Sequence, residues 1–196
     1  MNELIFFSNN KFKIREVKQI FVYKKIKVLT LKDFPKVKEP NESWNSFNEN
    51  AIIKSEFGYK QFGLPCFADD SGICISALDN QPGVHSKRFK QKIGSYKKTF
   101  QKIINATKKK NDFKAFFQTT IALTTNTKNT ICFEGIVKGK ISNKPIGIHG
   151  FHYDPIFIPE GSTNTFAEMD PEEKNKISHR AIAVKKLKNF LEKLFW

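Results

Sequence analysis

The sequence predicts an α/β protein built on a mixed sheet, and three features of the chain carry that prediction. An apolar run at residues 4–7, a segment of helical spacing and a second apolar run at 26–29 follow one another, as in a parallel strand pair. A third apolar run, at 64–75, surrounds two acids. Two longer β-rich runs, at 113–123 and 130–141, follow each other without a helix between them, so antiparallel strands should join the sheet.

Three helices are expected before the last one. The first has an apolar face at helical spacing, formed by Ile14, Val17, Ile20 and Phe21. Ser46 and Glu49 form a capping box that should open the second helix, which runs to about residue 61. The third is a basic amphipathic segment at 95–110 whose apolar side chains point inward.

The last helix should begin at Asp170, which can cap it, because Pro171 fits the first helical position and Glu173 follows three after the cap. A single continuous helix would then carry an apolar stripe at spacings of three and four, formed by Ile177, Ala181, Val184, Leu187, Leu191 and Leu194. A turn at 82–84 and a short strand at 156–158 complete the predicted elements.

Length and composition fit a soluble globular chain. The 196 residues suffice for one sizeable domain. We expect a single domain with one lobe at about 1–75 plus 160–196 and a second at about 76–159. No apolar run approaches transmembrane length and the N-terminus lacks signal-peptide features, so we expect a cytoplasmic protein without a membrane partner. The three cysteines lie in apolar runs and are expected to be reduced and buried: Cys66, Cys74 and Cys132.

The formal net charge of +15 and the pI of about 9.7 predict attraction to polyanions. Nucleic acid and phosphorylated small molecules both fit this charge, and so does compositional bias toward Lys, Asn, Ile and Phe. We interpret bias as the main cause, with a basic cleft superimposed on it. No recognisable nucleic-acid-binding motif accompanies the charge, so no stable nucleic-acid partner is expected.

The adjacent acids Asp69 and Asp70 are the centre of the candidate site. Two ionised carboxylates at the end of a buried strand are costly unless a metal ion or another cation compensates them. Together with Ser71 they suit a Mg²⁺ site. An ordinary Asp-Asp-Ser-Gly turn is the alternative. Glu39 and Glu42 are either further metal ligands or plain loop acids.

Other segments carry weaker signals. Residues 8–13 lie where a strand turns into a helix, so they form either an anion site at a helix N-terminus or a polar loop with a solvated lysine. Lys54 follows the capping box and is by default a surface lysine. Residues 151–154 place aromatics beside an acid, either to stack on a base or to anchor the core edge. Lys174 and residues 178–180 gather donors near the last helix.

These segments occur in order as seven motifs spread over residues 4–194. They are Ser8-x-Asn10-x-x-Lys13, Phe47-x-Glu49-Asn50-Ala51, Ala68-Asp69-Asp70-Ser71-Gly72, Pro82-Gly83-Val84-x-Ser86-x-Arg88, Phe133-Glu134-Gly135, Phe151-x-Tyr153-Asp154-Pro155-Ile156-Phe157 and Ser178-His179-Arg180. In this the chain resembles the Ham1 family of inosine triphosphate pyrophosphatases. The resemblance implies an elongated mixed sheet flanked by helices, with two lobes and a substrate cleft between them. It also implies a homodimer and Mg²⁺-dependent hydrolysis of ITP, dITP and XTP to the monophosphate and pyrophosphate, which cleans the nucleotide pool.

The resemblance also implies roles for individual residues. Asp70 matches the general base and a metal ligand, with Asp69 and Glu42 as further metal-site acids. The substrate-binding positions that it implies are Ser8, Asn9, Asn10, Lys11, Phe12, Lys13, Lys54, Ser71, Phe151, His152, Tyr153, Asp154, Lys174, His179 and Arg180. Among these, residues 8–13, Lys54, Ser71 and Lys174 would hold phosphates, whereas His179 and Arg180 would recognise the 6-carbonyl of the base.

Several positions depart from the family pattern and bear on substrate preference more than on activity. Asn9 and His152 stand where Gly is common, and His85 and Lys87 where Tyr and Ala are more usual; the segment 148–150 lacks the common Gly pair. Two rival interpretations remain. One is a related nucleotide pyrophosphatase with a shifted preference, and the other is a basic nucleic-acid-binding protein on a degraded nucleotidase scaffold.

Overall fold

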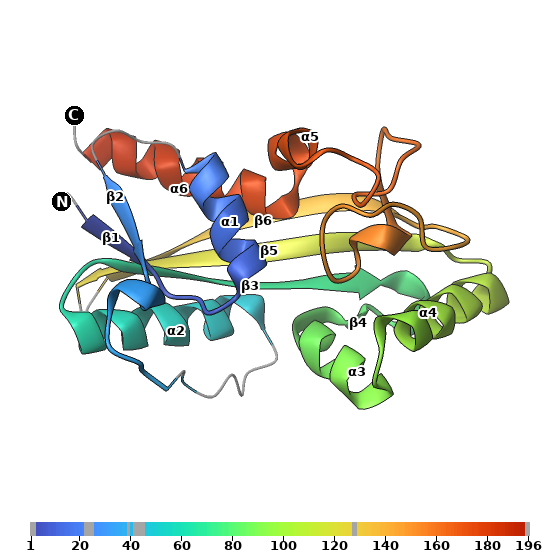
Figure 1. Ribbon diagram of the computed structural model, residues 1–196, viewed down its shortest axis with the longest axis horizontal. Coiled ribbons are helices and arrows are strands. Elements are labelled where there is room, and N and C mark those ends of the chain that lie inside the picture. Colours follow the sequence, from blue (N-terminus) through green and yellow to red (C-terminus); the bar gives the residue numbers. More distant parts are fainter. Residues whose placement is uncertain (1–2, 22–25, 39, 41–45, 127–128, 195–196) are drawn as a thin grey trace. The chain divides into compact units, whose positions relative to one another are not determined.

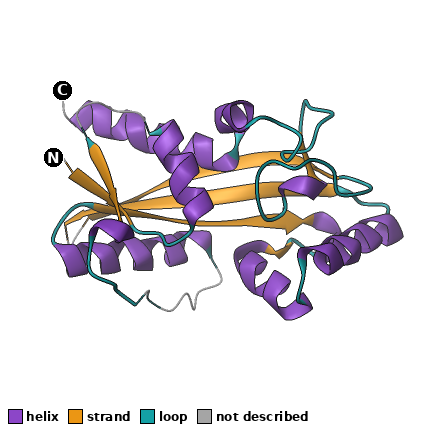
Figure 2. Cartoon of the chain, viewed as in Figure 1, coloured by secondary structure: helices purple, strands orange, loops and turns teal. Residues whose placement is uncertain are grey.

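The computed structural model describes residues 3–21, 26–38, 40, 46–126 and 129–194, in which a mixed sheet is flanked by helices (Figures 1 and 2). The strands are β1 (Glu3–Phe6), β2 (Lys27–Thr30), β3 (Cys66–Ile75), β4 (Gln81–Pro82), β5 (Lys114–Asn126), β6 (Asn129–Ile141) and β7 (Phe157–Pro159). Their order is β2-β1-β3-β5-β6-β7, with β4 paired to β3. β1 is parallel to β2 and β3, whereas the β3–β4 and β6–β7 pairs are antiparallel. The predicted α/β class with a mixed sheet is confirmed.

The helices of the described chain are α1 (Lys11–Ile20), α2 (Phe47–Phe62), α3 (Ser86–Ile93), α4 (Tyr96–Lys110), α5 (Pro171–Ile177) and α6 (His179–Leu194). Ser46 caps α2 by accepting the N–H of Glu49 at 3.1 Å, as the capping box predicts. The helix ends at Gly63, whose φ of +66° suits glycine. Helix α3 was not predicted, because its eight residues contain too few apolar positions to show a period.

The prediction of one continuous C-terminal helix is wrong. Ser178 has φ −65° and ψ 154°, an extended conformation that separates α5 from α6. Ile177 is 43% exposed and leaves the predicted stripe, whereas Ala181, Val184, Leu187 and Leu191 are fully buried as predicted. The break makes His179 the first residue of α6.

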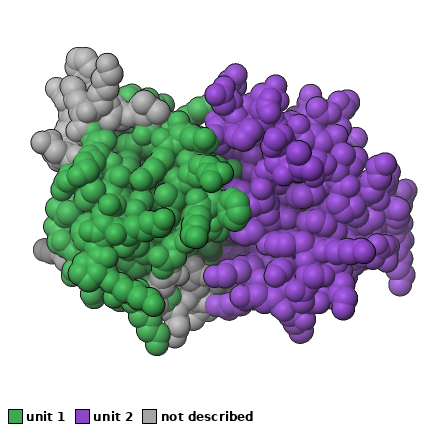
Figure 3. All heavy atoms as spheres, viewed as in Figure 1, with its two compact units in different colours: residues 1–70, 119–135, 180–196 green, residues 71–118, 136–179 purple. Residues whose placement is uncertain are grey.

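Two compact units make up the chain (Figure 3). Unit 1 comprises Met1–Asp70, Thr119–Gly135 and Arg180–Trp196, and unit 2 comprises Ser71–Gln118 and Ile136–His179. The core of unit 1 covers both faces of its part of the sheet, with Val17 and Leu187 in one cluster and Phe7 and Leu29 in another. The core of unit 2 includes Phe100 of α4. The predicted lobes, and the cleft predicted between them, stay predictions.

Two further expectations concern membranes and cysteines. None of the helices in the described part of the chain is both long and apolar enough to cross a membrane. Cys66 and Cys74 are free thiols and buried, as predicted. Cys132 is exposed, so the prediction for it is wrong: it lies in the stretch of β6 where alternate side chains face solvent.

Candidate active site

The segment between β1 and α1 is organised by Asn10, which caps the helix. The Oδ1 atom of Asn10 accepts the N–H groups of Phe12 at 3.0 Å and Lys13 at 3.3 Å. The N–H of Asn10 donates to Ser8 Oγ at 3.3 Å. Asn9 and Lys11 are exposed, and Phe12 is 49% exposed. Three of the N–H groups predicted to cradle phosphate are therefore already bonded within the segment.

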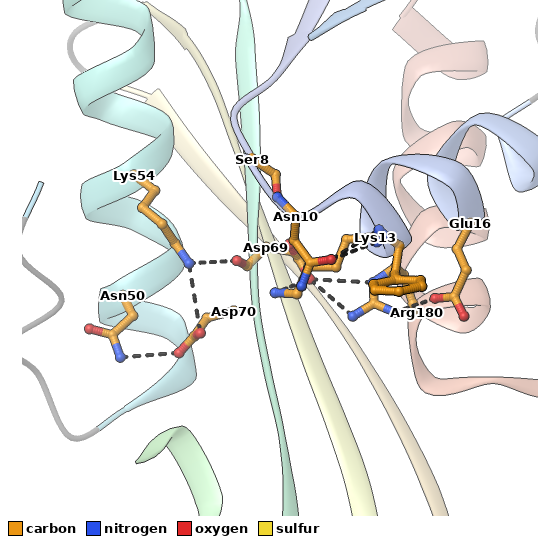
Figure 4. A network of polar contacts seen from close by, with 10 residues as sticks. Ser8, Asn10, Lys13, Glu16, Asn50, Lys54, Asp69, Asp70 and Arg180 are labelled. Carbon is orange, nitrogen blue, oxygen red and sulfur yellow. Dashed lines mark hydrogen bonds and ion pairs between the residues drawn. The ribbon is translucent and has the colours of Figure 1, made fainter. Parts of the chain in front are cut away.

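A buried ionic network in unit 1 surrounds Asp69 (Figure 4). Asp69 Oδ2 lies 3.0 Å from Lys13 Nζ and 3.4 Å from both Nε and Nη2 of Arg180. The Nη1 of Arg180 pairs with Glu16 Oε2, one turn along α1 from Lys13. Asp69, Glu16 and Arg180 are 2%, 8% and 1% exposed, so the network is held within the protein. Such placement excludes the ordinary surface turn as an account of Asp69.

The charges of this network depend on one another. Burial lowers the pKa of the Lys13 ammonium, although Asp69 acts in the opposite direction. Burial also acts to lower the pKa of Arg180, but the attraction of Glu16 and Asp69 outweighs it and raises that pKa overall. Lys13 is consequently the cation of this network that loses its proton more readily than a solvated lysine.

Asp70 belongs to a second set of contacts, made by helix α2. Its Oδ2 accepts the side-chain amide of Asn50 at 3.1 Å, and its Oδ1 lies 3.7 Å from Lys54 Nζ. Lys54 Nζ also donates to the backbone carbonyl of Asp69 at 2.6 Å. Asn50, Lys54 and Asp70 are all at least 94% buried. Lys54 is therefore not a surface lysine.

The two acids face different partners because they are neighbours in a strand. Successive side chains of an extended strand point to opposite faces of the sheet. Asp69 accordingly contacts α1 and α6, whereas Asp70 contacts α2 (Figure 4). Among the described residues no group of three His, Cys, Asp or Glu side chains is placed to hold a metal ion. Glu42, the predicted partner of these acids, and Glu39 lie outside the described residues.

In unit 2 the predicted base loop is built around a buried ion pair. Asp154 Oδ2 accepts Lys174 Nζ at 2.6 Å and the N–H of Phe151 at 2.7 Å. Lys174 Nζ lies 4.6 Å from the centre of the Phe151 ring, close enough for a cation–π contact. Asp154 and Lys174 are each 3% exposed. The structure thus places Lys174 with the aromatic loop.

The same loop holds two more predicted residues. His152 has φ +57°, a left-handed conformation that explains why glycine is favoured there, and its ring stacks on Tyr96 at 5.9 Å. The hydroxyl of Tyr153 donates to the backbone carbonyl of Ser86 at 2.6 Å. Burial raises the pKa of Tyr153, so this hydroxyl keeps its proton. Ser71 is half-buried on β3.

His179 lies on an aromatic platform. Its ring stacks on Phe117 with centroids 4.6 Å apart and planes 7° apart. Phe157 packs edge-on against Phe117 at 4.7 Å. Both His179 and Phe117 are buried, so the imidazole is held in one orientation by packing.

Several residues that take part in these arrangements were not among the predicted site residues. Glu16 could have been found from its i, i+3 relation to Lys13, and Asn50 from its i, i+4 relation to Lys54. Ser86 lay in a motif to which no role was given. Phe117 carries no signal of its own, because an apolar residue of a buried strand predicts packing alone.

Ser86 fixes the strand that follows the acids. Its Oγ accepts the N–H of Ile73 at 3.1 Å and donates to the carbonyl of Gly83 at 2.6 Å. A side chain at Gly72 would come within 2.0 Å of that carbonyl, so glycine is required there. Ser86 is 7% exposed, so this bridge is buried.

Replacing Ser86 with alanine should lower the free energy of unfolding by about 1–3 kcal/mol, because the buried N–H of Ile73 loses its hydroxyl partner and the Gly83 carbonyl keeps only the backbone N–H of residue 86. Urea denaturation measures this change. Ser162→Ala is the matched control, since that hydroxyl bonds Asn164 in an exposed turn. Equal effects of the two substitutions would contradict the bridging role of Ser86.

Known proteins match the chain over nearly its whole length. The model of the Ham1 family matches residues 4–190. A dITP/XTP pyrophosphatase of Porphyromonas gingivalis is 41% identical over 192 residues, which are 97% of this chain and 98% of that protein. A dITP/XTP pyrophosphatase of Coxiella burnetii is 38% identical over 200 residues, which cover 100% of this chain and 99% of that protein. The solved structure of a HAM1 protein from Coxiella burnetii superposes with a TM-score of 0.89 at 38% sequence identity, and the match covers 98% of this chain and 100% of that one. The solved structure of the Staphylococcus aureus Ham1 protein superposes with a TM-score of 0.86 at 34% sequence identity, and the match covers 98% of this chain and 99% of that one.

Proposed function

Because the chain belongs to the Ham1 family, we propose that it is a nucleoside-triphosphate pyrophosphatase acting on dITP, XTP and ITP. It would cleave between the α- and β-phosphates and release the monophosphate and pyrophosphate. The names of its relatives support the dITP and XTP activities. The observation that carries the proposal is the buried pair Asp69 and Asp70, each held by cationic side chains.

Asp70 is proposed as the general base. The Asn50 amide fixes one of its oxygens, and Lys54 stands 3.7 Å from the other. A carboxylate oriented in this way can take a proton from the attacking water. Asp69 would act as support, because its bonds to Lys13 and Arg180 order the strand that positions Asp70.

The proposed cofactor is Mg²⁺, which would neutralise charge developing on the phosphates. Hard oxygen donors suit this ion, and one or two carboxylates together with phosphate oxygens and water commonly complete its shell. The Asp70 carboxylate fits that role. Asp69 fits it less well, since two cations already neutralise its carboxylate. Glu42 stays a candidate for a second acid.

For the phosphates and the base we propose separate residues. Lys13, 15% exposed at its side chain, and Lys54 would attract phosphate oxygens. The aromatic loop with Phe151 and Tyr153 would contact the base, and His179 would donate to the 6-carbonyl of hypoxanthine or xanthine. Adenine carries an amine at that position, so the donor would be left unpaired, which disfavours ATP.

Pyrophosphate release across ITP, dITP, XTP, GTP and ATP, with and without Mg²⁺, tests the proposal. We expect release from the first three, in the presence of Mg²⁺, to exceed release from ATP by at least about 100-fold. Equal rates with ATP and ITP would favour a pyrophosphatase of shifted preference. A lack of release from every nucleotide would contradict the enzymatic proposal.

Activity should also depend on the charge of Lys13. Because its pKa is lowered by burial, this ammonium loses its proton at a lower pH than a solvated lysine does. We therefore expect KM for ITP to rise toward alkaline pH as the positive charge disappears. In Lys13→Arg the guanidinium stays charged, so the alkaline rise should be reduced. Lys60→Arg on exposed α2 surface is the control, and an unchanged KM profile in Lys13→Arg would contradict this role.

A homodimer and a cytoplasmic location also remain proposals. Light scattering on the purified protein measures the former. Fractionation of cells that produce the protein tests the latter.

A further inference from the structure

The longest stretch of the chain that contains no acid is strongly basic. Residues 80–111 contain ten lysine and arginine residues and no aspartate or glutamate. These 32 residues contribute +10 of the formal net charge of +15, and the other 164 contribute +5. Residues 11–38 are nearly as basic, with ten lysine and arginine residues and two acids, which give a net charge of +8 in 28 residues. Residues 80–111 differ from them in having no acid to offset the cations.

The structure places this segment on two neighbouring helices of unit 2. It contains all of α3 and α4, which pack against each other (Figure 1). The apolar side of α4 is turned into the core, where Phe100, Ile103 and Ile104 are at most 8% exposed. The basic side chains consequently occupy the opposite, solvent-facing side.

The lysines of α4 have a regular arrangement. Lys98, Lys102 and Lys109 follow one another at i, i+4 and i+11, which keeps them within about 40° of each other around the helix axis. Their side of the helix lies opposite Phe100 and Ile103, and all three are exposed. The stripe runs for about 16 Å along the helix at 1.5 Å per residue. On α3, Lys87 and Lys92 are exposed and add to the same charge.

We propose that α3 and α4 form a surface that binds the phosphate backbone of double-stranded nucleic acid. A duplex carries about one negative charge per 1.7 Å of its axis, so a 16 Å stripe of lysines meets several phosphates at once. Contacts to phosphates do not depend on the base sequence of the nucleic acid. Binding depends on charge alone and is weak at high salt, in agreement with the lack of a recognisable nucleic-acid-binding motif.

Two other polyanions fit this surface less well. Proteins that bind single strands stack bases on exposed aromatic rings. Here the Tyr96 ring packs against Phe100, His152 and Tyr153 and lies under Lys90, while Lys102 covers Phe89. A helix that enters an anionic membrane needs a free apolar face. The apolar face of α4 is already buried in the core.

The test compares two triple variants of the full chain with the same loss of charge. Lys98→Gln/Lys102→Gln/Lys109→Gln removes the α4 stripe, and Lys32→Gln/Lys36→Gln/Lys38→Gln removes three exposed lysines of unit 1. Fluorescence anisotropy measures binding to a 24-base-pair DNA duplex, the RNA duplex of the same sequence and a single-stranded dT24. Sedimentation with phosphatidylserine vesicles measures binding to membranes.

For the unaltered protein we expect the affinity for duplex to fall by about 100-fold between 50 and 200 mM salt, as about four phosphate contacts would give. The α4 variant should bind at least about tenfold more weakly at 50 mM and show a salt slope lower by about 3, whereas the unit 1 variant should change by less than about twofold. Comparable affinities for the DNA and RNA duplexes are expected, because both offer the same backbone charge.

Equal losses in the two variants would overturn the proposal, since net charge alone would then explain binding. Tighter binding to dT24 or to the vesicles than to the duplexes would also overturn it. Pyrophosphate release from ITP should be unchanged in the α4 variant. If the protein binds duplex but hydrolyses no nucleotide, the result would contradict the proposed enzymatic function and would still support the proposed binding surface.

Discussion

Substituting Asp70 with asparagine should reduce pyrophosphate release from ITP by about 10³-fold, because general-base catalysis contributes about 10²–10⁴-fold. The amide has the size of the carboxylate but cannot accept the proton of the attacking water. Lys13 and Lys54, the proposed phosphate-binding cations, are left in place. We therefore expect the dissociation constant for a nonhydrolysable ITP analogue to change by less than about fivefold.

Steady-state pyrophosphate release and isothermal titration calorimetry measure the two quantities. Asp79→Asn makes the same chemical change at an exposed acid that pairs with Lys110 at the surface, and its activity should remain normal. If Asp70→Asn retained most of its activity, another residue would have to be the base. A loss of analogue binding as large as the loss of rate would make Asp70 a binding residue.

Much of this site was predictable from sequence because its residues stand in short, local patterns. The capping box placed α2, and an acid pair within an apolar run marked two buried charges that need compensation. The prediction that this pair ends the strand is wrong, because β3 continues past it to Ile75. The contacts between distant segments were not predictable. Nothing in the sequence around Lys54 distinguishes a lysine buried against Asp69 from one in solvent.

The break at Ser178 shows a second limit of prediction from the sequence. An apolar stripe at spacings of three and four continues across it, so the pattern favours one helix. The extended backbone of Ser178 is set by tertiary packing, which overrides local propensity. The two residues that follow this break have different partners. The ring of His179 stacks on Phe117, whereas the guanidinium of Arg180 pairs with Glu16 and Asp69.

Removing the Arg180 side chain, as in Arg180→Met, should lower the free energy of unfolding by about 3–5 kcal/mol. Asp69 and Glu16 are buried, and the substitution takes away the guanidinium that compensates both. Urea denaturation measures the loss. Arg15→Met, at an exposed position of α1, is the matched control and should change stability by less than about 0.5 kcal/mol.

A double variant separates loss of charge balance from loss of packing. In Glu16→Gln/Arg180→Met one buried acid is neutralised together with the cation, so part of the stability lost in Arg180→Met should return. No recovery would mean that Arg180 stabilises the protein through packing. The family resemblance also implies that Arg180 recognises the 6-carbonyl of the base. The ratio of kcat/KM for ITP to that for ATP, measured on Arg180→Ala at a temperature where it stays folded, tests this role. A guanidinium that also contacts the base should lower the ratio when it is removed, whereas an unchanged ratio would confine Arg180 to holding Asp69.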